Sequence, residues 1–134
     1  MSSFVYEGRV RACPRPKVAR ATGAAYMPKW YRPYLEKLGW AYRAAGGIHY
    51  GDRPVRVTVD VMRALPASRP KRVESEPDDV KPDLDNVVKA VLDALNGVAY
   101  DDDAQVVSIC AMKCDRTRLP ERMRVSVRPA DGED

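Results

Sequence analysis

The chain has 134 residues, of which 45% are hydrophobic and 31% are charged, and its formal net charge is +4. This composition is typical of a globular protein and excludes an intrinsically disordered one, and the length fits a single domain over residues 1–134. The sequence has no apolar run long enough to cross a membrane and no secretion signal at its start, so neither a membrane span nor export is predicted.

The numbers of cysteines and histidines limit the kinds of disulfide and metal site that the chain can form. Cys13, Cys110 and Cys114 form no Cys-x-x-Cys pair, and an odd number favours free thiols of a reducing, cytoplasmic protein over a disulfide framework or a zinc site. The chain has a single histidine, His49, which excludes metal sites that need several histidines.

The charge is divided unevenly along the chain. Residues 1–82 contain 16 Lys/Arg and 8 Asp/Glu, whereas residues 83–134 contain 7 and 11. A basic half attracts a polyanion, and an acidic half repels it unless metal ions are bound there. This division is more typical of a metal-dependent nuclease than of a plain nucleic-acid-binding protein.

The N-terminal half contains the signals of two strands and one helix. Alternating residues predict an opening strand over Phe4–Ala12, bulged or broken at Gly8. A helix is predicted over 28–45, where a Gly-Gly pair ends it, and alternating valines predict a strand over 54–65. The aromatic residues of the helix are expected to pack in the core, with a base-stacking surface as the alternative. They are Trp30, Tyr31, Tyr34, Trp40 and Tyr42.

The second half adds a loop, a helix and two more strands. The polar loop 67–80 is either mobile or ordered by a ligand. Strands are predicted over 105–113 and 121–128, followed by a tail over 130–134. Together the elements predict an α+β fold, a small mixed β-sheet with two main helices in the order β-α-β-α-β-β. The pattern leaves the order of strands in the sheet open. The loop also contains a candidate phosphate-binding cluster of Arg69, Lys71 and Arg72.

The best-defined element is a helix that begins at Leu84. Apolar residues recur at offsets 0, 3, 4, 7, 8 and 11 as far as Leu95, which is the stripe of an amphipathic helix. Pro82 suits the helix entry, and an Asn-Gly pair is a stop signal. Asp83 or Asp85 can cap the first free N–H groups.

Acidic residues stand at both ends of this helix. Lys89 lies four residues beyond Asp85 and so on the same side. The triplet Asp101-Asp102-Asp103 follows the helix, and a strand packed beside the helix can bring it back to Asp83 and Asp85. Converging carboxylates repel each other unless a cation binds, and oxygen ligands suit Mg²⁺ or Mn²⁺. The alternative is that the first pair only caps the helix and the triplet is solvated.

The segment Lys81-Pro-Asp-Leu-Asp-Asn-x-x-Lys, with the later Leu-Asp-Ala-Leu-Asn-Gly and Asp-Asp-Ala-Gln-Val, resembles the signature of the RusA family of Holliday junction resolvases. The resemblance covers nearly the whole chain and implies a RusA-like, Mg²⁺-dependent endonuclease of a kind frequent in phages and prophages. It implies that Asp83, Asp85 and Asp103 are catalytic and bind the metal, and that Lys89 is catalytic. Asp102 also matches, but less well than Asp103.

A second part of the resemblance concerns the basic loop after the opening strand. This loop contains Pro-x-Pro-Lys-x-x-Arg before Tyr26-Met27-Pro28, as the family does. On this basis Arg15, Lys17 and Arg20 are predicted to contact phosphates, positioning DNA without reading its sequence. The alternative is a basic loop that is only solvated.

The resemblance further implies a homodimer whose two active sites make paired cuts in a four-way DNA junction and leave 5′-phosphate ends. Two alternatives remain open from the sequence. One is a nuclease for other branched DNA, such as flaps or forks. The other is a non-enzymatic nucleic-acid-binding protein.

Overall fold

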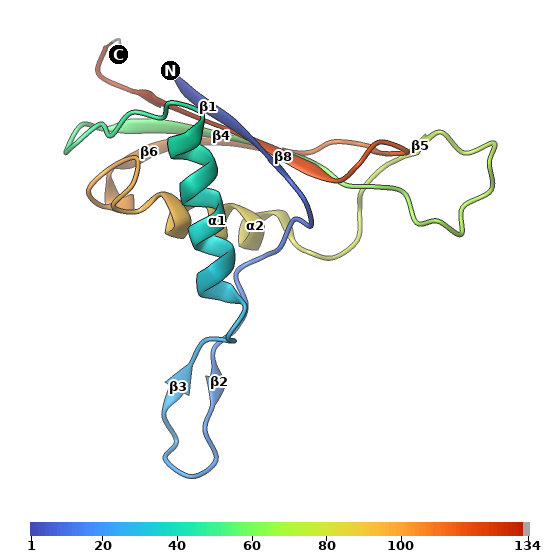
Figure 1. The fold of residues 1–134 in the computed structure, drawn as a ribbon, viewed down its shortest axis with the longest axis horizontal. Helices are drawn as coiled ribbons and strands as arrows, with labels where there is room; N and C mark the ends of the chain where they lie inside the picture. Colours follow the sequence, from blue (N-terminus) through green and yellow to red (C-terminus); the bar gives the residue numbers. More distant parts are fainter. Residues whose placement is uncertain (133–134) are drawn as a thin grey trace.

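The computed structural model describes residues 1–132 as a mixed four-stranded sheet with two helices on one of its faces (Figure 1). The predicted α+β class and the order of the main elements are confirmed. The predicted tail ends in residues 133–134, which lie outside the described residues. The main elements are β1 (Ser2–Glu7), α1 (Tyr31–Ala44), β4 (Val55–Met62), α2 (Leu84–Leu95), β6 (Val106–Lys113) and β8 (Arg122–Pro129).

Short strands and a 3-10 helix lie outside the main sheet. The short strands β2 (Lys17–Val18) and β3 (Ala25–Tyr26) form a hairpin that extends away from the sheet (Figure 1). The strands β5 (Ser75–Glu76) and β7 (Arg116–Thr117) pair beyond the other end of the sheet, and a 3-10 helix, η1 (Asp103–Gln105), precedes β6.

The sheet has the strand order β1-β8-β4-β6. β8 pairs antiparallel with both β1 and β4, whereas β4 and β6 are parallel. Two neighbouring parallel strands need a crossover between them, and α2 provides it. As a result the carboxyl ends of β4 and β6 lie at the same end of the sheet. Arg63 directly follows β4, and Lys113 is the last residue of β6.

The hydrophobic core lies between the sheet and the helices. All four valines that alternate along β4 are buried, and so are three tyrosines of α1, namely Tyr31, Tyr34 and Tyr42. The predicted core role of the aromatic residues is thus confirmed for these three. The two tryptophans differ, because Trp30 is half-buried and Trp40 is 67% exposed.

Helix α2 has the bounds that its apolar stripe predicts. It packs against α1 and β6, with Val87, Val91 and Leu95 almost fully buried. Gly97 then adopts a positive φ of 79°, which favours glycine. The chain turns there, and the buried Tyr100 donates its hydroxyl to the Leu92 carbonyl at 2.9 Å.

The opening strand is shorter than predicted. β1 ends at Glu7, and Gly8 takes a φ of 147° while its N–H donates to the Glu121 carbonyl. The following residues therefore leave the sheet: the N–H of Val10 donates to the Glu121 carboxylate at 2.7 Å, and the N–H of Cys13 donates to the Asn86 carbonyl at 2.8 Å.

The three cysteines are free thiols, as predicted. Among the helices within residues 1–132, none is long and apolar enough to span a membrane.

Candidate functional site

The entry of α2 places two aspartates at the head of the helix. Asp83 is the N-cap residue, in extended conformation, but its side chain caps no N–H group. It instead accepts a hydrogen bond of 2.9 Å from Lys81. Asp85, in the first turn, accepts a bond of 2.9 Å from the N–H of Asn86. Of the two aspartates predicted as alternative caps, Asp83 therefore caps no N–H group, whereas Asp85 accepts from one of the first free N–H groups of the helix. Both carboxylates remain exposed.

The aspartate triplet after α2 is divided among three roles. Asp101 lies 3.5 Å from the imidazole of His49. Asp102 caps η1 by accepting from the Ala104 N–H, while the side chain of Gln105 accepts from the N–H of Asp102. Asp103 is the half-buried member. Its carboxyl shares a side-chain hydrogen bond with that of Asp102, and burial and this contact raise the pKa of Asp103.

Asp103 lies against the exposed side of α2. Burial raises its pKa, the carboxylates of Asp102 and Asp93 add to the increase, and the ammonium of Lys89 opposes it. Two of the groups that affect this pKa, Lys89 and Asp93, belong to α2. Repulsion among carboxylates of this kind is relieved by a cation.

One cavity of about 480 Å³ joins these groups. Asp85 and Lys89 line it from α2, Asp103 from η1, and Ile109 and Ala111 from β6. The structure thus brings three of the four predicted catalytic residues to one cavity. Asp83 is not among the residues that line it.

Asp93 also lines this cavity. Its carboxylate accepts a hydrogen bond of 2.6 Å from the hydroxyl of Tyr31 on α1. Burial and this bond raise the pKa of Tyr31. The spacing of Asp85, Lys89 and Asp93, four residues apart on one helix face, is the sequence signal that identifies Asp93.

The number of acidic side chains that lie together decides how they can hold a metal ion. Among the residues described, no group of three or more His, Cys, Asp and Glu side chains lies close enough to hold a metal ion, so the predicted aspartates do not form a closed cage. Mg²⁺ commonly keeps several waters and takes one or two carboxylates plus substrate phosphates. Asp85 and Asp103, around one cavity, fit a cation that is shared with a substrate.

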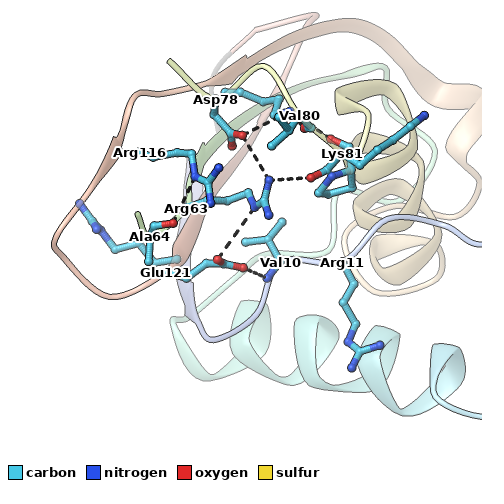
Figure 2. A network of polar contacts seen from close by, with 12 residues as sticks. Val10, Arg11, Arg63, Ala64, Asp78, Val80, Lys81, Arg116 and Glu121 are labelled. Carbon is cyan, nitrogen blue, oxygen red and sulfur yellow. Dashed lines mark hydrogen bonds and ion pairs between the residues drawn. The ribbon is translucent and has the colours of Figure 1, made fainter. Parts of the chain in front are cut away.

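A network of polar contacts holds the segment before α2 (Figure 2). Arg63 donates to the Lys81 carbonyl at 2.8 Å and to Asp78 at 3.2 Å. Lys113 donates to the carbonyls of Val80 and Pro82 at 2.6 and 3.1 Å. The side chain of Asp78 is fully buried between the two cations. Two cations at one sheet edge thus bind three successive carbonyls before Asp83.

The predicted DNA-binding residues lie in two places. Arg15, Lys17 and Arg20 are exposed on and beside the β2–β3 hairpin. In the second cluster, Lys71 and Arg72 are exposed, but Arg69 is paired with Glu76 at 3.0 Å.

The loop that contains this second cluster is ordered by the protein itself. The guanidinium of Arg118 donates to the carbonyls of Arg69, Pro70 and Val73. Neither cluster includes Arg9 or Arg11, which line a second cavity beside the entry of α2.

Comparison with known proteins gives two findings. Residues 7–128 match a protein family described as "Endodeoxyribonuclease RusA". The chain is also 32% identical, over 123 residues, to the uncharacterized protein YqaN of Bacillus subtilis (strain 168). That alignment covers 82% of this chain and 84% of the relative.

Proposed function

Because the chain belongs to the RusA endodeoxyribonuclease family, we propose that it resolves Holliday junctions by paired cuts in a four-way DNA junction, with Mg²⁺ as cofactor. The observation that carries the proposal is the shared cavity of Asp85, Lys89 and Asp103. Two carboxylates and one ammonium around a cavity are what a phosphodiester hydrolase needs to hold a cation and a phosphate together.

In this proposal Asp85 and Asp103 hold the metal, and Mn²⁺ is a possible substitute. The bound ion would polarise the scissile phosphate and lower the pKa of a water molecule. The single histidine accepts a bond from the Gly51 N–H and faces Asp101, so the proposal gives it no part in proton transfer.

Asp83 completes the proposed ligand set through an exchange of partners. Its ion pair with Lys81 is exposed, with side chains 50% and 85% accessible. Exposed pairs of this kind contribute only about 0–1 kcal/mol. A DNA phosphate can therefore take Lys81 at little cost and free the Asp83 carboxylate for the cation.

Lys89 supplies a fixed positive charge beside the scissile phosphate. Phosphodiester hydrolysis builds negative charge on the phosphoryl oxygens in the transition state, and a cation already in position stabilises that charge. Attack by water in line with the leaving 3′ oxygen breaks the P–O3′ bond and leaves a 5′-phosphate and a 3′-hydroxyl.

Paired cuts require two active sites, and we propose a homodimer. Strand β6 is an edge of the sheet, and it exposes Val107, Ile109 and Met112. Exposed apolar edge strands are commonly covered by a partner, which supports association of two copies.

One cleavage experiment tests the proposal. A synthetic four-way junction, a flap, a fork and a linear duplex are incubated with the protein, with and without Mg²⁺. Symmetric Mg²⁺-dependent nicks in the junction alone are expected. Cutting of flaps or forks instead would assign a different branched substrate, and metal-independent binding without cutting would reject the enzyme.

A further inference from the structure

A second cavity, of about 740 Å³, is lined in part by Lys81 and Pro82 at the entry to α2. We propose that it binds one strand of DNA next to the catalytic aspartates, an inference that rests on the proposed function. Its walls come from the end of β1 and the segment after it, from the residue before α1, from Arg63 after β4, from the Lys81-Pro82 entry and from the turn before β8. The volume is within the roughly 300–1,000 Å³ of typical binding sites.

The charges of this cavity favour a polyanion. Four cations line it, against Glu7 and Glu121. Glu121 is already engaged, because it accepts from the Val10 N–H at 2.7 Å and lies 3.9 Å from Arg63. The cations are Arg9, Arg11, Arg63 and Lys81.

Two of these cations are available to a ligand. Arg63 is bound to Asp78 and to the Lys81 carbonyl, whereas neither Arg9 nor Arg11 pairs with a carboxylate among the residues described. Guanidinium groups in this state are suited to phosphate oxygens, because they present several N–H donors in one plane.

An aromatic ring lies beside these two arginines. Trp30 lines the same cavity, and the Arg11 guanidinium lies 4.5 Å from the centroid of its ring. Stacked aromatic rings beside arginines are the usual features of sites for single nucleic-acid strands, where bases stack and phosphates meet cations. A site for a simple anion has no need of the indole.

The cavity is also preformed, and it lies next to the proposed catalytic residues. Its wall segment is held by bonds from the Val10 and Arg11 N–H groups to Glu121 and Tyr34 (Figure 2 shows the first). Preformed sites lose little conformational entropy on binding. Lys81 forms part of the wall and directly contacts Asp83, so a strand in the cavity continues to the head of α2.

The two tryptophans permit a direct test, because the chain contains only Trp30 and Trp40. The tryptophan fluorescence of the Trp40→Phe variant comes from Trp30 alone. The fluorescence of the Trp30→Phe variant comes from Trp40, whose ring centroid lies 5.7 Å from the Arg43 guanidinium. Both are titrated in EDTA with a four-way junction and with a single-stranded oligonucleotide. We expect saturable quenching of Trp30 and an unchanged signal from Trp40.

Arginine variants give the second readout. Arg9→Gln and Arg11→Gln should each weaken DNA binding and reduce the slope of log K against log salt by about 1. Arg43→Gln removes the matched arginine from the other tryptophan and should bind DNA as the parent does.

Three results overturn the inference. They are DNA binding by anisotropy with a silent Trp30, parental salt slopes in both arginine variants, and equal quenching by thymidine monophosphate and DNA at the same concentration, which indicates a small-nucleotide site. None of these affects Mg²⁺-dependent cleavage, so the proposed function can survive them. Conversely, quenching of Trp30 without any cleavage keeps the strand site and rejects the nuclease.

Discussion

The ammonium of Lys113, the last residue of β6, donates a hydrogen bond of 3.1 Å to the carbonyl of Pro82, 31 residues earlier in the chain. Pro82 directly precedes Asp83, so the edge of the parallel strand pair determines where the first proposed ligand stands. Arg63, which follows β4, does the same for the Lys81 carbonyl. The geometry at the head of α2 is therefore set by the sheet as well as by the helix.

Outside the catalytic cavity, removal of the Asp78 carboxylate should lower the free energy of unfolding more than removal of any other charge. Asp78→Ala leaves Arg63 and Lys113 largely buried without their carboxylate, and loss of one partner in a buried cluster costs about 3–5 kcal/mol. Urea unfolding measures the change. The control is Glu36→Ala, whose ion pair with Arg32 is exposed on α1 and whose loss should cost about 0–1 kcal/mol. Equal losses in the two variants would contradict the network's role.

The proposed metal ligands should separate cleavage from binding. Asp85→Asn and Asp103→Asn should abolish cleavage yet retain junction binding, because each removes a metal ligand and a charge that repels phosphate. Asp101→Asn is the matched control. Asp102→Asn is a second one, since asparagine also caps helices. Both controls should cut at near the parental rate in a gel assay, and a parental rate for Asp103→Asn would reject its assignment.

Lys89 should contribute to rate more than to folding. Its side chain is on the exposed side of α2, so Lys89→Ala should unfold near the parental denaturant concentration. Loss of one group that stabilises transition-state charge should lower the single-turnover rate about 10²–10³-fold. Lys89→Arg keeps the charge and should recover part of that loss. An unchanged rate in the alanine variant would place the lysine outside the reaction.

Tyr34 should make the fold sensitive to alkali. Burial raises the pKa of Tyr34 to about 12, and its hydroxyl accepts from the Arg11 N–H. A folded-state pKa above the unfolded value near 10 means that the neutral form stabilises the fold. This contribution is complete below pH 10 and is lost as the pH rises towards 12, by about 2–3 kcal/mol.

The Tyr34→Phe variant isolates this contribution from that of other tyrosines. The difference in unfolding free energy between parent and variant should shrink across the same pH range. A difference that stays constant from pH 9 to 12 would show that the pKa of this hydroxyl is the same in the folded and unfolded states.

The β2–β3 hairpin should supply salt-dependent affinity. Replacing Arg15, Lys17 and Arg20 together by glutamine should weaken junction binding and lower the log–log salt slope by up to about 3, one for each lost phosphate contact. The control is Arg32→Gln, which removes an exposed arginine paired with Glu36 on α1. A triple variant with the parental slope would show that the hairpin is only solvated.

The sequence alone was sufficient for features that depend on local spacing. The stripe from Leu84 to Leu95 identifies α2 with its bounds, the valines identify β4, and the four-residue step from Asp85 to Lys89 places both on one helix face. These periods follow from backbone geometry, about 3.6 residues per turn in a helix and 2 in a strand, and need no knowledge of neighbours.

Only the tertiary structure decided which partner each charged group has. Three adjacent aspartates look alike in the sequence, yet Asp101 faces His49, Asp102 caps η1 and Asp103 lines one cavity with Lys89. Asp83 is held by Lys81, and Arg9 and Arg11 line a cavity with Trp30. A charge acts on whatever lies within a few ångströms, and the parallel pairing of β4 with β6 and the packing of α2 bring those groups together from distant parts of the chain.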